Sequence, residues 1–167
     1  MIAGLTTAVY TSVHVLVSLV GIGCGFVVLI GMIGGKRLDG WTALFLATTV
    51  ATSLSGFGFP AEHLLPSHVV GAVSLLVLAV GILARYPFHM EGAWRRVYVV
   101  CAALALYLNV FVLVVQAFLK VAPLKALAPN QMEPPFVASQ LVVLALFLVL
   151  SVLAATRFRE GAARARS

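Results

Sequence analysis

Long apolar runs, separated by short polar turns, make up most of the chain. They predict five membrane-spanning helices over residues 5–34, 41–59, 68–84, 97–119 and 136–155. Each run is long enough, because a helix needs about 17 to 25 residues to cross the hydrocarbon layer. The proline-rich segment 120–135 is expected to be an ordered external loop. The pattern therefore predicts an all-α integral membrane protein, with residues 1–158 as a single transmembrane helical bundle and 159–167 as a basic tail.

The composition agrees with a membrane protein and excludes an ordinary soluble domain. Hydrophobic residues make up 62% of the chain, charged residues only 10%, and the mean hydropathy is +1.11. Soluble domains average about 45–50% apolar and about 25% charged residues. The net charge of +6 does not indicate nucleic-acid binding, because the basic residues fall in short clusters between the apolar runs. We expect a lipid bilayer, and no nucleic acid, as the surroundings of this chain.

The basic residues divide unevenly between the two sets of turns. Nine lie on one side and two on the other, namely Lys36, Arg37, Arg85, Arg95, Arg96, Arg157, Arg159, Arg164 and Arg166 against Lys120 and Lys125. Because basic turns stay in the cytoplasm, the N-terminus is expected outside and the C-terminus inside. We expect the membrane to be the inner (plasma) membrane of a bacterium.

Small and polar residues mark one face of the first span. They recur at steps of four and three residues, as Thr7, Thr11, His14, Ser18, Gly21 and Gly25. Gly21 and Gly25 form a small-xxx-small pair, as do Gly31 and Gly35, and such pairs let helix backbones approach closely in lipid. We therefore expect the first span to pack tightly against a neighbour, within this chain or in a partner membrane protein or second copy.

Polar residues from several spans are expected at one depth, near the outer surface. Counting about 20 residues from each cytoplasmic boundary, at about 1.5 Å per residue, places His14, His68, Gln116, Gln140 and Asn109 in the outer half. His63 belongs to the loop that precedes His68. Apart from Ser151, the inner half carries no comparable set. Polar groups in lipid must find partners, so this outer layer is the candidate site.

Three kinds of ligand fit such a layer. A quinone needs hydrogen-bonding groups near the headgroups and an apolar slot, which His14, His68, Gln116 and Gln140 supply together with Phe57, Phe59 and Phe136. A single haem b could be held by His14 and His68 from different helices. A metal could bind His14, His63 and His68 with Glu62 or Glu133, although their spacing matches no established motif. The competing interpretation is that no ligand binds, and that Asn109, Gln116 and Gln140 only form hydrogen bonds between helices, each worth about 0.6 kcal/mol.

No catalytic motif accompanies these residues, so whether the chain is an enzyme is left open. Ser53 and Ser55 lack the Gly-x-Ser-x-Gly context of a nucleophile, and no pair of carboxylates lies inside a span. Two hypotheses follow. The chain is either a membrane subunit that binds a quinone, or one haem b, in support of electron transfer, or a non-catalytic accessory or assembly subunit that docks through the Gly-rich face of the first span.

Overall fold

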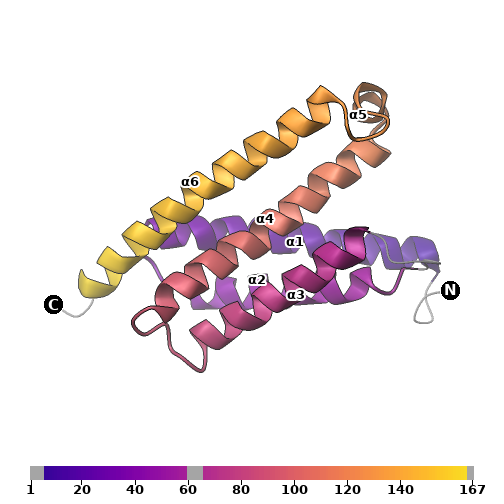
Figure 1. The fold of residues 1–167 in the computed structure, drawn as a ribbon. Coiled ribbons are helices and arrows are strands. Elements are labelled where there is room, and N and C mark those ends of the chain that lie inside the picture. The colour runs from indigo at the N-terminus through magenta and orange to yellow at the C-terminus, as the bar shows by residue number, and fades with distance from the viewer. Residues whose placement is uncertain (1–5, 60–65, 165–167) are drawn as a thin grey trace.

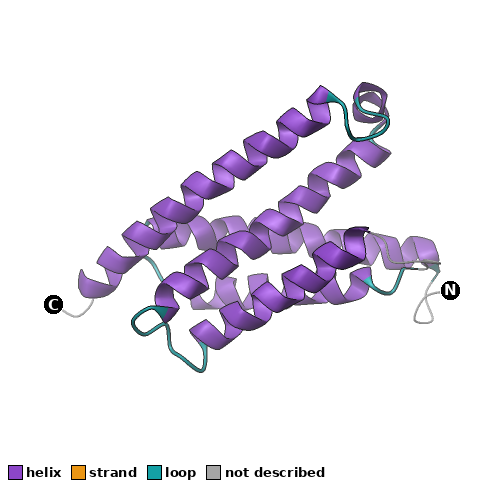
Figure 2. Ribbon diagram, viewed as in Figure 1, coloured by secondary structure: helices purple, strands orange, loops and turns teal. Residues whose placement is uncertain are grey.

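The computed structural model describes residues 6–59 and 66–164, with side chains up to Phe158. Within these residues every regular element is an α-helix (Figures 1 and 2). The helices are α1 (Thr7–Ile33), α2 (Asp39–Gly56), α3 (Pro66–Arg85), α4 (Trp94–Lys120), α5 (Ala122–Leu127) and α6 (Pro134–Arg164). The prediction of an all-helical protein is therefore confirmed.

Successive long helices run up and down along a common direction, and short α5 caps one end of the α4–α6 pair (Figure 1). Helix α4 contacts every other helix, while α1 contacts α2, α4 and α6. The core consists of side chains where these helices meet, including Cys24, Phe45, Leu78 and Leu106. Most of the remaining apolar side chains lie on the outside of the bundle, as a protein in contact with lipid requires.

Four of the described helices are long and apolar enough to cross a membrane: α1, α3, α4 and the part of α6 from Pro134 to Phe158. Helix α2 has 18 residues, so its length would suffice. Its hydropathy is lowered by six hydroxyl side chains, Thr42, Thr48, Thr49, Thr52, Ser53 and Ser55. Three of these, Thr42, Thr49 and Ser53, are buried against other helices, so part of the polar surface of α2 faces the inside of the bundle.

The helices differ from the sequence-based expectation by up to three residues at most ends, and more strongly at two places. The segment 120–135 contains the short helix α5, which has Pro123 in its first turn, where a missing amide hydrogen costs nothing. Helix α6 was expected to end near residue 155 but continues to Arg164. No proline follows Pro135, and alanine and arginine, which favour helices, are frequent in that stretch.

The small-residue face of α1 packs against α2 and α4. A Cβ atom on Gly25 would lie 2.5 Å from Leu106 Cδ1 and 2.9 Å from Phe45 Cε2, so any larger residue there would force these side chains to shift. Gly21 faces Thr48, and Gly31 faces Leu38. The predicted close approach is confirmed, and its partners at these three glycines lie within the same chain. Gly35 instead adopts a positive φ of 70° in the turn after α1.

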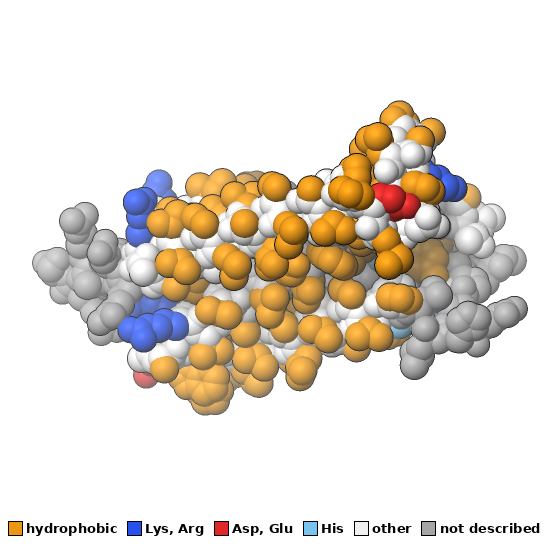
Figure 3. All heavy atoms as spheres, turned by 45° about the horizontal axis from the view of Figure 1, so that its top comes forward, with side chains coloured by type: hydrophobic (Ala, Val, Ile, Leu, Met, Phe, Trp, Pro, Cys, Tyr) orange, Lys and Arg blue, Asp and Glu red, His pale blue; other side chains and the backbone are white. Residues whose placement is uncertain are grey.

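Charged groups gather at the end of the bundle where the α1–α2 and α3–α4 turns meet. The buried guanidinium of Arg85 donates to the Asp39 carboxylate and lies over the ring of Tyr98, 5.1 Å from its centroid. The ion pair ties the start of α2 to the end of α3. In Figure 3 the blue Lys and Arg side chains cluster at this end, and a further basic group lies beside α5 at the opposite end.

Candidate functional site

Hydrogen bonds between α1 and α2 run along the polar face of α1. His14 Nδ1 lies 2.8 Å from Ser55 Oγ. One turn further on, the Ser18 hydroxyl is 2.7 Å from the carbonyl of His14 and 3.3 Å from Thr52 Oγ1. These bonds give polar side chains the partners that a lipid environment does not supply. The bond to Ser55 also holds the imidazole of His14 on the side of α1 that faces α2.

The direction in which the Ser55 hydroxyl donates is linked to the nitrogen of His14 that carries the proton. The Ser55 hydroxyl has a single hydrogen and lies 3.1 Å from the carbonyl of Thr52, which can only accept. When Ser55 donates to that carbonyl, its oxygen accepts from His14, so the proton of a neutral imidazole is on Nδ1. The lone pair is then on Nε2, which has no hydrogen bond within the described part of the chain. Such a nitrogen can accept a hydrogen bond or ligate a metal.

Aromatic rings cover this imidazole at the end of α2. The Phe59 ring meets the rings of His14 and Tyr10 edge to face, each at 5.1 Å between centroids. The Tyr10 hydroxyl donates to the carbonyl of Ser55 at 2.7 Å. A Cβ atom on Gly58 would lie 2.3 Å from the Tyr10 oxygen, so the absence of a side chain there makes room for the tyrosine.

His68, in the first turn of α3, lies against the same end of α2. Its ring stacks on Phe57 at 5.5 Å between centroids and 16° between planes. The segment Ser55–Phe59 therefore contacts both histidines, His14 through Ser55 and Phe59 and His68 through Phe57. A ligand shared by the two imidazoles stays a prediction. His63 and Glu62 lie outside the described residues.

Asn109 lies deeper in the bundle and binds another helix. Its side-chain nitrogen is 3.4 Å from Thr49 Oγ1 on α2. Nearby on α2, the Ser53 hydroxyl donates to Ser74 on α3 at 3.1 Å. Asn109 thus forms a hydrogen bond that joins α4 to α2. This agrees with a structural role for Asn109, the alternative to ligand binding.

The two glutamines belong to the contact between α4 and α6. Gln140 donates to the carbonyl of Phe111 at 3.3 Å, while its buried Oε1 has no partner among the described residues. Gln116 is half-buried and makes no hydrogen bond in the described part of the chain. Phe136 packs edge to face on Phe118 at 5.4 Å. The structure therefore gives the predicted layer two groups of polar residues, one at α1–α2–α3 and one at α4–α6.

Metal binding receives no support from the geometry of the described residues. No three His, Cys, Asp or Glu side chains among them lie close enough to hold an ion. Glu133, a proposed ligand, accepts hydrogen bonds from Asn130 Nδ2 at 3.0 Å and from the amide of Met132 at 3.0 Å. It therefore closes the turn that precedes α6.

The sequence-based analysis overlooked several residues of this network. Tyr10 is four residues before His14 and shares its helical face, so the same helical spacing could have identified it. Thr42, Thr49 and Ser53 follow steps of seven and four residues, so helical spacing could have identified a second polar face on α2. Their burial shows that both faces of α2 carry interhelical contacts.

Comparisons with protein-family models, with curated proteins and with solved structures found no match for this chain. Its function is therefore inferred from its own residues.

Proposed function

We propose that the chain is a small five-span subunit of the bacterial inner membrane that binds a quinone in its outer half, in support of electron transfer. The observation that carries the proposal is the imidazole of His14, which Ser55 orients while Nε2 has no partner within the described residues. The hydroxyl of a reduced quinone would donate to Nε2. Phe59 offers apolar ring surface beside His14, and Phe57 does so beside His68.

The surroundings of His14 favour a ligand that arrives from the lipid. Val13 and Leu16, next to the histidine on α1, expose 51% and 64% of their surface. His14 itself is partly exposed. A lipid-soluble headgroup can therefore approach the imidazole along the side of α1, and polar groups near a headgroup interface with apolar walls suit a quinone.

The proposed topology has the N-terminus outside, and it rests on the distribution of charge and on one ion pair. The Arg85–Asp39 contact brings the α1–α2 turn and the α3–α4 turn to the same end of the bundle. With four crossings, omitting α2, those turns would lie on opposite sides of the membrane. Crossing by α2 as well keeps them together and keeps the basic turns in the cytoplasm.

Quinone content of the purified protein tests the proposal. Full-length protein is purified in detergent, extracted with organic solvent, and assayed for quinone by chromatography. We expect about one quinone per chain for wild type and a loss of most of it in His14→Leu, which removes both nitrogens but keeps the bulk. An equal quinone content in the two proteins, or none in wild type, would contradict the proposal.

His89, which lies outside the proposed site, provides the matched control. His89 is exposed in the α3–α4 turn at a φ of 47°, a conformation that asparagine tolerates well. The variant His89→Asn should retain quinone as wild type does. An absorbance spectrum of the same samples separates the haem hypothesis, because a b-type haem gives a strong Soret band. A clean spectrum without quinone would favour the second candidate, a non-catalytic accessory subunit.

A further inference from the structure

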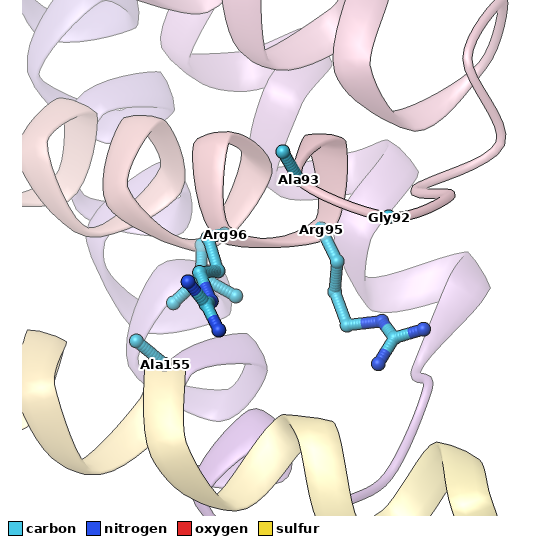
Figure 4. Close-up of a pocket in the computed structure, with 6 residues that line it drawn as sticks. Gly92, Ala93, Arg95, Arg96 and Ala155 are labelled. Atoms are coloured by element: carbon cyan, nitrogen blue, oxygen red, sulfur yellow. The ribbon is translucent and has the colours of Figure 1, made fainter.

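A pocket of about 360 Å³ opens at the basic end of the bundle, between the start of α4 and the far part of α6. It is lined by Gly92, Ala93, Arg95, Arg96, Val99 and Ala155. Figure 4 shows both arginine side chains extending from α4 towards the side on which α6 lies. Val99 is almost fully buried, so part of the pocket's wall belongs to the apolar core.

Neither guanidinium in this pocket is neutralised by the described part of the chain. Arg95 and Arg96 make no ion pair or hydrogen bond there, whereas nearby Arg85 pairs with Asp39. Two cations that line one pocket repel each other, and an anion bound between them would remove that repulsion. Guanidinium groups match the planar pair of oxygens of a phosphate particularly well.

In the proposed topology, the pocket lies near the level of the cytoplasmic lipid headgroups. Trp94, adjacent to Arg95, stacks on Phe88 with their ring centroids 4.0 Å apart, and aromatic residues of this kind mark membrane interfaces. Val152, one turn before Ala155 on α6, exposes 63% of its surface and faces outward from the bundle. A phospholipid beside α6 could thus place its phosphate at the arginines and its glycerol against Val99 and Ala155.

We propose that this pocket binds the phosphate of an anionic phospholipid headgroup. Basic pockets between transmembrane helices at the cytoplasmic side suit such lipids, because charge and apolar contact act together. A free phosphate shares the oxyanion chemistry but gains nothing from the apolar wall. The site is separate from the outer polar layer, so it does not depend on the quinone proposal.

Lipid retention in native mass spectrometry tests this site. Full-length protein in detergent is titrated with phosphatidylglycerol, and with phosphatidylcholine as the zwitterionic reference. For the double variant Arg95→Gln/Arg96→Gln we expect phosphatidylglycerol affinity to fall by about fivefold for each guanidinium removed. The control, Lys36→Gln/Arg37→Gln, removes two exposed charges from the same end and should stay close to wild type. Equal losses in both double variants would mean general surface attraction and would overturn the proposal.

A second variant, which changes no charge, keeps the proposal testable if the double variant misfolds. Ala155→Phe fills the pocket and leaves both arginines in place, so it should also weaken phosphatidylglycerol binding. Unchanged binding in Ala155→Phe would overturn the pocket assignment. Addition of millimolar inorganic phosphate separates the two sources of the anion. Retained lipid supports the headgroup, and displaced lipid would show that the site takes free phosphate.

Discussion

At the residue scale, Gly25 offers the sharpest test of packing. A Cβ atom there would overlap Leu106 and Phe45, both of which are buried. Gly25→Ala should therefore destabilise the bundle by about 1–3 kcal/mol, the usual cost of overpacking a core. Thermal unfolding in detergent, followed by circular dichroism, measures the change.

Gly23 is the matched control on the same helix. A Cβ atom at Gly23 would meet nothing within 4 Å, so Gly23→Ala should leave stability unchanged or raise it by a few tenths of a kcal/mol. If Gly25→Ala and Gly23→Ala unfold at the same temperature, the close approach of α1 to α4 is not as tight as these distances indicate.

Residue identity and spacing predicted much of the α1–α2 contact but not its details. The steps of three and four residues from Thr7 to Gly25 define one face, and the structure packs that face on α2. The pairing of His14 with Ser55 depends on how far the two helices slide along each other, which spacing does not reveal. The sequence alone does not predict this register, because it is set by the packing of the two helices.

At the element scale, the turn before α6 is held by Glu133. Desolvation raises the pKa of this carboxyl, but hydrogen bonds from the backbone of Glu133, Asn130 and Met132 and from the Asn130 side chain outweigh it. The pKa is therefore held below its ordinary value of 4.5. A lowered pKa means that the carboxylate form stabilises the turn. This contribution is present above pH 4.5 and is lost as the pH falls through the lowered pKa.

Amide hydrogen exchange measures this effect locally. The amides of Asn130 and Met132 donate to the Glu133 carboxylate, so their protection factors should be higher near neutral pH than in acid well below pH 4.5. In Glu133→Gln, that dependence on pH should be absent. The amide of Ala128, bonded to the carbonyl of Leu124, is the internal control and should not respond. Protection of Asn130 and Met132 that is independent of pH would show that the carboxylate does not hold the turn.

The elements themselves were more predictable than their roles. Long apolar runs locate the helices because lipid tolerates no unpaired backbone, and this holds for α1, α3, α4 and α6. Helix α2 was also predicted from its apolar run, yet its hydroxyl groups are explained only by contacts with α1, α3 and α4. Helix α5 escaped prediction because it has only six residues and lies among prolines.

At the scale of the whole molecule, the sequence predicts a depth for each polar residue but not its orientation around the helix axis. Counting residues from the basic turns placed His14, His68, Gln116 and Gln140 near one level. The structure distributes them over two contacts, with the histidines against the end of α2 and Gln140 at the α4–α6 contact. Counting along a helix gives height, but the neighbour that a side chain meets depends on the packing of five helices together. The polar residues of the predicted layer therefore form two separate groups, and their common depth stays a prediction.

The arrangement of charge and contacts leads to a prediction about membrane topology. Single cysteines replace Lys36, Glu91 and Asn130 in a background that lacks Cys24 and Cys101, and intact cells are treated with a maleimide that does not cross membranes. With five spans, the cysteine at 130 should react from outside, while those at 36 and 91 should react only after permeabilisation. This follows because the Arg85–Asp39 ion pair holds the turns containing residues 36 and 91 at the same basic end. The three variants serve as controls for one another, since all occupy polar turns. Labelling of positions 36 and 91 from opposite sides would mean that α2 does not cross, and His14 and His68 would then no longer share the outer half.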